Sequence, residues 1–125
     1  MPSDEIPDDL RDFIVTQIDS IAQLEALLLL KENPERDWTS ENCASRLYIP
    51  ETEAAVLLST LAGRGFLDAS ENAYRFNCQT PEQADFVRRL AELYRQRLIT
   101  VTNLIHSKQN RIQEFADAFR LRKDS

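Results

Sequence analysis

The scarcity of glycine constrains the fold of this chain more than any other feature of its sequence. Only two glycines occur among the 125 residues, and both lie in the stretch Gly63-Arg64-Gly65. Because tight turns often need the positive φ that glycine supplies, this composition disfavours a turn-rich all-β fold. It also disfavours the glycine-rich loops that bind phosphate groups. Hydrophobic residues make up 42% of the chain, so a mainly helical single domain can bury an ordinary core.

Two helices are predicted in the first third of the chain. Apolar residues recur at helical spacing over residues 8–18, and Pro7 suits the start of a helix. A second helix follows Ser20, whose hydroxyl can cap it, with Gln23 at the spacing of a capping box. Its wide leucine-rich face predicts a place at the centre of the core, and Asn33-Pro34 ends it.

A third and a fourth helix are predicted before residue 64. Either Thr39 or Ser40 can cap the third helix, which is short and runs to about Leu47. The fourth helix is expected over residues 51–62, because its apolar residues recur at helical spacing. Gly63 is its expected stop.

A β-hairpin and a long helix are predicted to complete the chain. Residues 65–69 and 73–76 bracket the polar turn Ser70-Glu71-Asn72, which is typical of a hairpin. Thr80 can cap the terminal helix, since Pro81 suits its first position. No glycine or proline occurs from Glu82 to Ser125, so we expect a long terminal helix, which would be on the order of 60 Å long if it were continuous over residues 81–122.

The predicted terminal helix carries a heptad pattern. Its apolar residues alternate steps of three and four, as in the seam of a coiled coil. We predict that this seam joins two copies of the chain in a homodimer through Val87, Tyr94, Leu98, Val101, Ile105, Ile112, Phe115 and Phe119. A helix that folds back on its own domain is the alternative. Lys108 interrupts the seam, where it either sets register and oligomeric state or marks a bend.

The order helix, short strand, helix, turn, helix, hairpin resembles the winged helix-turn-helix fold over residues 20–78. Residues 38–44 (WTSENCA) resemble the entry to the second helix of that fold, and residues 61–67 (LAGRGFL) are similar to the junction before its wing. Residues 93–105 are similar to the tail of a group of small bacterial proteins that have a winged-helix core. In function, the resemblance is to bacterial transcriptional regulators of the MarR-like type.

One residue departs from the pattern of this fold. The turn between the third and fourth helices commonly carries glycine, and Tyr48 stands there in this chain. We expect Tyr48 either to pack in this turn or to be exposed, at some cost in backbone conformation.

The fourth predicted helix is the one that enters the major groove in DNA-binding winged helices. Reading bases requires Arg, Lys, Asn or Gln on its outer face, and residues 50–62 contain none of these. Glu51 and Glu53 would repel phosphates at its amino-terminal end. The predicted contact residues, for DNA or for a protein partner, are Thr52, Val56, Ser59, Thr60, Arg64 and Arg75.

The charge of the chain is divided unevenly along its length. The net charge is -6, and residues 22–78 carry five basic and nine acidic residues, whereas residues 79–125 carry nine basic and six acidic ones. Because non-specific affinity for DNA comes from phosphate neutralisation, the acidic head favours a protein partner. A dimer that brought Arg64, Arg75 and the tail charges onto one surface would bind DNA, which is the alternative.

No catalytic, metal-binding or cofactor-binding residues are predicted. His106 is the only histidine, and Cys43 and Cys78 lack the spacing of zinc ligands or of a redox pair. We therefore expect a protein that is not an enzyme and that needs no cofactor. Residues 1–12 are acidic, unlike a secretory signal, and the longest apolar run spans residues 26–30. We expect a cytoplasmic protein with reduced cysteines and no membrane contact.

Three parts are predicted along the chain. They are an acidic amino-terminal arm with a short helix (residues 1–19), a winged helix-turn-helix domain (residues 20–78) and a long dimerising helix (residues 79–125). The predicted function is that of a non-catalytic regulatory protein in transcriptional or signalling control, which acts through contacts with another protein. The alternative is a dimeric MarR-like regulator that binds DNA. A small-molecule pocket between the head and the dimer helices is compatible with either function.

Overall fold

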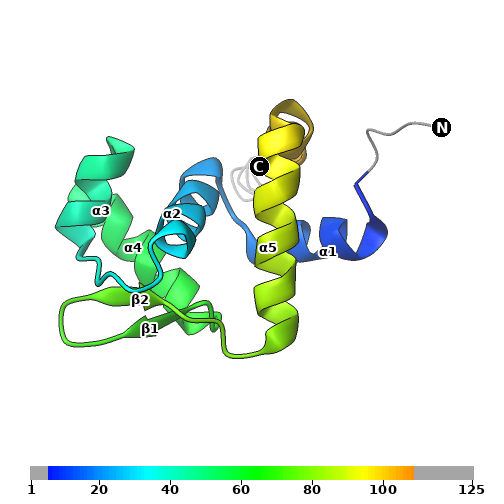
Figure 1. The fold of residues 1–125 in the computed structure, drawn as a ribbon. Coiled ribbons are helices and arrows are strands. Elements are labelled where there is room, and N and C mark those ends of the chain that lie inside the picture. The colour runs from blue at the N-terminus through cyan, green and yellow to red at the C-terminus, as the bar shows by residue number, and fades with distance from the viewer. Residues whose placement is uncertain (1–5, 109–125) are drawn as a thin grey trace, which may run out of the picture.

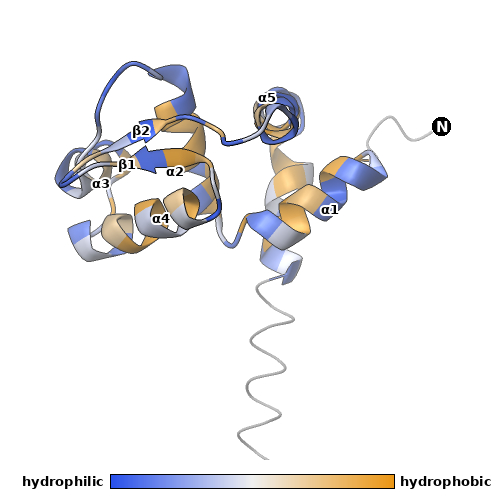
Figure 2. Cartoon of the chain, turned by 90° about the horizontal axis from the view of Figure 1, so that it is seen from below, coloured by the Kyte–Doolittle hydropathy of each residue, from blue (hydrophilic) through white to orange (hydrophobic). Residues whose placement is uncertain are grey.

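The computed structural model describes residues 6–108, which are mainly helical with one two-stranded antiparallel sheet (Figure 1). The elements are α1 (Asp8–Gln17), α2 (Ile21–Glu32), α3 (Ser40–Leu47), α4 (Glu51–Gly63), β1 (Leu67–Ala69), β2 (Tyr74–Phe76) and α5 (Pro81–Gln96). Residues 98–108 form a further helical segment. Helices α2, α3 and α4 gather with the hairpin into a head, and α1 and α5 lie to one side of it (Figure 2). This arrangement confirms the predicted winged helix-turn-helix fold.

Side-chain caps fix the starts of three helices. The Ser20 hydroxyl accepts a hydrogen bond from the Gln23 amide at 3.1 Å, as the capping-box spacing predicts. Thr39, rather than Ser40, caps α3, because its hydroxyl accepts from the Asn42 amide at 3.0 Å. Thr80 begins α5 with a complete capping box. These local signals therefore place the head and α5 along the chain as the sequence predicts.

The winged head is closed by a short strand that precedes α3. The hairpin pairs Leu67 with Phe76 and Ala69 with Tyr74. Trp38 adds a bridge to Tyr74, with both backbone hydrogen bonds at 2.7 Å. The Trp38 side chain is fully buried, so this short strand anchors the hairpin to the core shared by α2 and α4.

Gly65, and not Gly63, is the glycine that the backbone requires. Helix α4 ends at Gly63 as predicted, but the next residue, Arg64, is still in the right-handed region. Gly65 has a φ of 93°, a conformation that side-chain-bearing residues rarely adopt. A Cβ atom at Gly65 would lie 2.9 Å from Oε1 of Gln79, the end of a flexible and exposed side chain that can shift, so the positive φ rather than close packing is what requires glycine.

Helices α1 and α2 meet at a bend of 106°. On the far side of this bend, the buried face of α1 packs against α5, where the rings of Phe13 and Phe86 stack at 4.8 Å between centroids. Among the described residues no single helix is long and apolar enough to cross a membrane, although α1 and α2 together, as a bent pair, have the length and composition to do so.

The terminal helix is not continuous over residues 81–122, because α5 ends at Gln96. Arg97 has φ -133° and ψ 53°, and the chain then turns into the separate segment of residues 98–108. Val101 and Ile105 in this segment are buried in the hydrophobic core of their own chain. The run Ile99-Thr100-Val101-Thr102 is rich in β-branched residues, which have a weak helix propensity. The segment is nevertheless helical, because this packing outweighs the weak propensity. Residues 112, 115 and 119 of the predicted seam lie outside the described residues.

Substitutions on opposite faces of α4 test this packing. Leu58 is 0% exposed, whereas Val56 is 65% exposed on the same helix. We expect Leu58→Ala to lower the free energy of unfolding by roughly 2–5 kcal/mol, because it leaves a cavity. Val56→Ala is the control and should change this free energy by less than about 0.5 kcal/mol. Urea unfolding followed by circular dichroism measures both values, and equal losses would contradict the orientation of α4.

Candidate functional site

The outer face of α4 is an exposed stripe on the head. Thr52, Val56 and Ser59 are exposed, and Thr60 is half-buried beside them. The opposite face carries the buried residues of the helix, Ala54, Leu57, Leu58 and Leu61. The structure therefore brings four of the six predicted contact residues together on one helical stripe.

The amino-terminal end of this stripe is negatively charged. Glu51 and Glu53 lie in the first turn of α4, and both are exposed. They stabilise the positive end of the helix dipole, which explains their position without any binding role. They also place negative potential at the end of the helix that would meet a ligand first.

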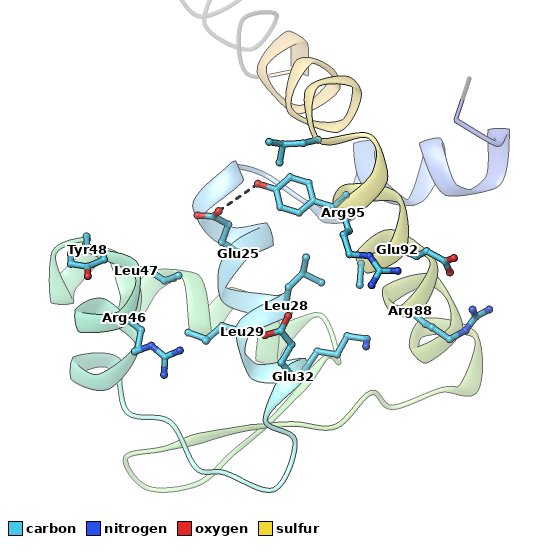
Figure 3. Close-up of a pocket in the computed structure, with 14 residues that line it drawn as sticks. Glu25, Leu28, Leu29, Glu32, Arg46, Leu47, Tyr48, Arg88, Glu92 and Arg95 are labelled. Atoms are coloured by element: carbon cyan, nitrogen blue, oxygen red, sulfur yellow. Dashed lines mark hydrogen bonds between the residues drawn. The ribbon is translucent and has the colours of Figure 1, made fainter. Parts of the chain in front are cut away.

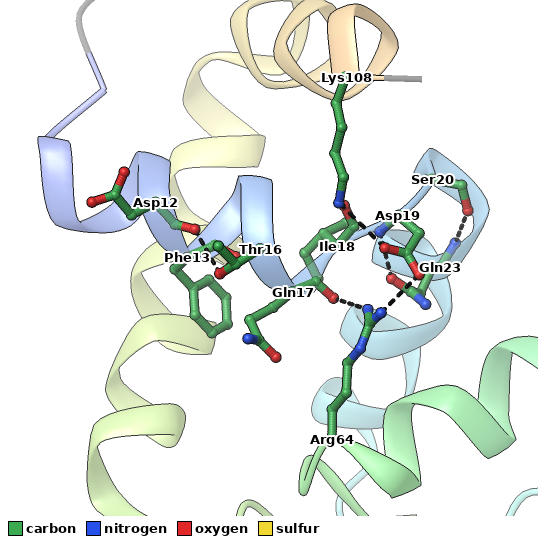
Figure 4. Close-up of polar contacts among 10 residues, drawn as sticks. All are labelled: Asp12, Phe13, Thr16, Gln17, Ile18, Asp19, Ser20, Gln23, Arg64 and Lys108. Carbon is green, nitrogen blue, oxygen red and sulfur yellow. Dashed lines mark hydrogen bonds and ion pairs between the residues drawn. The ribbon is translucent and has the colours of Figure 1, made fainter. Parts of the chain in front are cut away.

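The two predicted basic contact residues are both paired with carboxylates of their own chain. Arg64 is 29% exposed at its side chain, and its Nη2 atom lies 3.0 Å from Oδ2 of Asp19. Its Nη1 atom donates to the carbonyl oxygen of Gln17, so the guanidinium points toward the bend between α1 and α2 (Figure 4). Arg75 in β2 lies 2.9 Å from Oδ1 of Asp37, at the surface. The spacing of charges in the sequence could not reveal these pairs, because their partners lie 45 and 38 positions away.

Tyr48 connects α3 to α4 in a strained and exposed position. Its φ of 58° and ψ of 45° are left-handed, and it is the one residue besides glycine with positive φ in the part of the chain that the structure describes. This conformation costs an L-residue roughly 1–2 kcal/mol. The side chain is 95% exposed, so it returns almost no burial energy to the fold. Of the two predicted alternatives, exposure is confirmed.

An open cleft of about 820 Å³ separates the head from α5 (Figure 3). Leu28, Leu29 and Leu47 give it apolar walls on the side of α2 and α3. Tyr94 and Leu98 face them from the opposite wall. The contributing residues come from separate helices, so no local pattern in the sequence could assemble them. The cleft agrees with the sequence expectation of a space between the head and the terminal helices.

The rim of this cleft carries both signs of charge. Glu25 and Glu32 come from α2, and Arg88 and Arg95 come from α5 (Figure 3). The Tyr94 hydroxyl donates to Oε2 of Glu25 at 3.4 Å across the cleft. Burial, together with the negative charge of Glu25, raises the pKa of Tyr94. The mixed rim selects no ligand by net charge alone.

The cysteines are free thiols with suppressed reactivity. Cys43 is buried and Cys78 is half-buried, and no disulfide joins them. Burial raises the pKa of both thiols, and that of Cys78 reaches about 11. Both side chains are therefore protonated at neutral pH, which disfavours nucleophilic or metal-ligand roles. Within residues 6–108, no three His, Cys, Asp or Glu side chains gather as a metal site would require.

The head and its exposed α4 stripe define a winged helix-turn-helix protein. A crystal structure of the adhesin competence repressor from Streptococcus pyogenes is similar to this chain, with a TM-score of 0.50 and 15% sequence identity. The similarity covers 94% of this chain and 95% of the repressor chain, so it includes the helices outside the head. No protein-family model and no curated protein matches the sequence. At this identity the likeness establishes the fold alone.

The strain at Tyr48 can be tested by two substitutions. Tyr48→Gly should unfold at a urea concentration at least as high as the parent, because glycine relieves the left-handed conformation and little burial is lost. Tyr48→Val should lower the free energy of unfolding by about 1 kcal/mol, since a β-branched residue suits this conformation least. A marked loss in Tyr48→Gly would mean that the ring contributes to folding.

Proposed function

We propose that this chain is a non-catalytic, cytoplasmic regulatory protein that acts through its winged head on a protein partner in transcriptional or signalling control. One observation carries the proposal: the exposed face of α4 presents Thr52, Val56 and Ser59 and lacks any basic side chain. In a winged helix that reads DNA, this face supplies the donors for bases and phosphates.

Electrostatics argue for protein over DNA at this surface. Phosphate neutralisation supplies nearly all non-specific DNA affinity, and the nearest guanidinium groups, of Arg64 and Arg75, are already paired with Asp19 and Asp37. Turning Arg75 to a phosphate would break its pair with Asp37, and turning Arg64 would leave Asp19 with Lys108 as its remaining cationic partner.

The exposed stripe has the composition of a small protein-binding surface. Tyr48 supplies a large aromatic ring held outward by a constrained backbone, and Val56 supplies an apolar contact one turn into α4. Aromatic residues dominate the energies of protein interfaces, and a preorganised side chain loses little entropy on binding. Glu51 and Glu53 beside them complement a partner with basic residues around an apolar anchor.

Self-association through the terminal helices is part of the proposal. Val87, Val101 and Ile105 of the predicted seam are buried within the chain, so they are already in contact with its own core. Tyr94 is half-buried, and Leu98 is 49% exposed. A dimer of the described conformation would therefore use the exposed edge of the seam at Leu98, continued by residues beyond 108.

DNA binding by a MarR-like dimer is the second candidate function. The observation that favours it is the structural likeness to a repressor over nearly the whole chain, helices outside the head included. In that case two heads would act together, and basic residues of residues 79–125 would add to the contact surface.

Binding to random duplex DNA distinguishes the two functions. We expect no binding in fluorescence anisotropy at low ionic strength, because the head offers no free phosphate contacts on α4. Affinity that falls steeply with added salt would instead establish the second candidate. Arg75→Ala should then weaken binding, whereas Lys31→Ala, which removes a charge from the end of α2, is the matched control.

Sedimentation velocity at micromolar concentration tests self-association. We expect a dimer, and we expect Leu98→Glu to weaken it, because the substitution places a charge at an apolar contact. Leu98 is half exposed, so the monomer should retain its fold, which circular dichroism can verify. Val56→Glu on the head is the control and should leave the dimer intact. A monomer at all concentrations would contradict the proposal.

A further inference from the structure

The bend between α1 and α2 is the place where the head and the tail of the chain are tied together. We define the α1–α2 joint as residues 17–20. We propose that Asp19 in this joint is a conformational lock that couples the docking of residues 98–108 to the end of α4. Displacing Lys108 from Asp19 then loosens the head, without any direct contact between Lys108 and α4.

Two cations converge on the Asp19 carboxylate from opposite parts of the chain (Figure 4). Nη2 of Arg64 lies 3.0 Å from Oδ2, and Nζ of Lys108 lies 3.2 Å from Oδ1. Each cation also donates to a backbone carbonyl of the joint, Arg64 to that of Gln17 and Lys108 to that of Ile18 at 2.9 Å. Each cation therefore makes two contacts with the joint, Arg64 through its two Nη atoms and Lys108 through its single Nζ atom.

The joint itself is held in place from α2. Gln23 is the buried polar residue of the described core, at 2% exposure, and its Oε1 atom accepts from the Asp19 amide at 2.7 Å. The Gln23 amide in turn donates to the Ser20 hydroxyl. These bonds fix the backbone of Asp19, so its carboxylate presents a constant geometry to the two cations.

Arg64 transmits the state of the joint to the head. It directly follows α4, and its amide donates to the carbonyl oxygen of Thr60 at 3.0 Å. Its own carbonyl oxygen accepts from Nε2 of Gln83 at 2.8 Å, which ties the start of α5 to the same residue. The end of α4, the start of α5 and the joint thus all contact one residue, Arg64, the first two through its backbone and the joint through its side chain.

Lys108 links the helical segment of residues 98–108 to the joint. The sequence pattern places it in the heptad seam, where a partner helix would face it. In the structure its side chain is only 18% exposed, because the ammonium is turned onto the joint, and Val101 and Ile105 are buried beside it. Pairing along the whole seam and docking on the joint use the same residues, so the two arrangements exclude each other.

The lock opens when Lys108 is displaced from Asp19, and not when Asp19 is protonated near neutral pH. Burial raises the pKa of Asp19, but the hydrogen bonds from Arg64 and Lys108 lower it, and the net result is a pKa below the ordinary value. The carboxylate is therefore ionised at every pH above that range, and any stabilisation it gives is lost only in acid. Release at neutral pH therefore requires that Lys108 leave its contacts with Asp19 and the carbonyl oxygen of Ile18. This coupling holds whichever ligand the head binds.

Hydrogen exchange in the full chain tests the coupling. In Lys108→Gln we expect the amides of Arg64 and Phe66, which donate to Thr60 and Leu61, to exchange roughly fivefold faster. Lys31→Gln removes the same charge outside the joint and should leave these amides unchanged. Faster exchange confined to residues 98–108 would overturn the proposal, because Lys108 would then hold only its own segment.

A double-mutant cycle assigns the coupling to Asp19. Asp19→Asn keeps the shape of the side chain and the backbone bond to Gln23, and thermal melting verifies that it folds. In this background, adding Lys108→Gln should leave the exchange of the Arg64 and Phe66 amides unchanged. A full fivefold effect of Lys108→Gln in the Asp19→Asn background would overturn the assignment. If Asp19→Asn does not fold, Asp19→Ser, which also removes the carboxylate, serves instead, and full additivity with Lys108→Gln would overturn the assignment in the same way.

Discussion

The burial of α2 is the interaction on which the rest of the structure depends. Leu24, Ala26, Leu27 and Leu30 are inaccessible to solvent, and the helix packs against α3, α4 and β2 at once. Its other leucines, Leu28 and Leu29, face the cleft toward α5. Because α2 is apolar around most of its circumference, it must lie between two layers. This requirement places the other elements of the head, α3, α4 and the hairpin, on one side of α2 and α5 on the other. The joint at its amino-terminal end then fixes where α1 leaves the head.

Elements whose signals are local could be predicted from the sequence, and elements set by distant contacts could not. The caps at Ser20 and Thr80 are decided within four residues, so their spacing alone identifies them. No glycine or proline lies near Arg97, so the local sequence does not indicate that α5 ends there. The heptad pattern showed that Val101 and Ile105 must be covered, but periodicity does not say by what. Their own chain covers them, which turns a seam predicted for a partner into part of the core.

The same distinction applies to the candidate site. The exposure of Thr52 and Val56 follows from helical periodicity, which separates the two faces of α4. The state of Arg64 does not, because its availability depends on Asp19, which the bend in the chain brings beside it. A count of charges treats Arg64 as a free cation, whereas in the folded chain it forms an ion pair with Asp19. The contribution of Arg64 to the surface potential of the head is therefore smaller than a count of charges implies.

The pairing of Arg64 with Asp19 connects the function of the head to the state of the tail. While Lys108 and Arg64 share the Asp19 carboxylate, the guanidinium at the end of α4 is paired within its own chain. If Lys108 leaves, Asp19 retains Arg64 as its cationic partner. The end of α4 is then still joined to the start of α5 by the hydrogen bond from Gln83 to the carbonyl oxygen of Arg64. Arg64 then faces the undivided charge of the Asp19 carboxylate, so its guanidinium is held more tightly and is less available to an external anion. The availability of the Arg64 guanidinium is thus not a property of the α4 surface alone: it depends on the joint that holds this side chain.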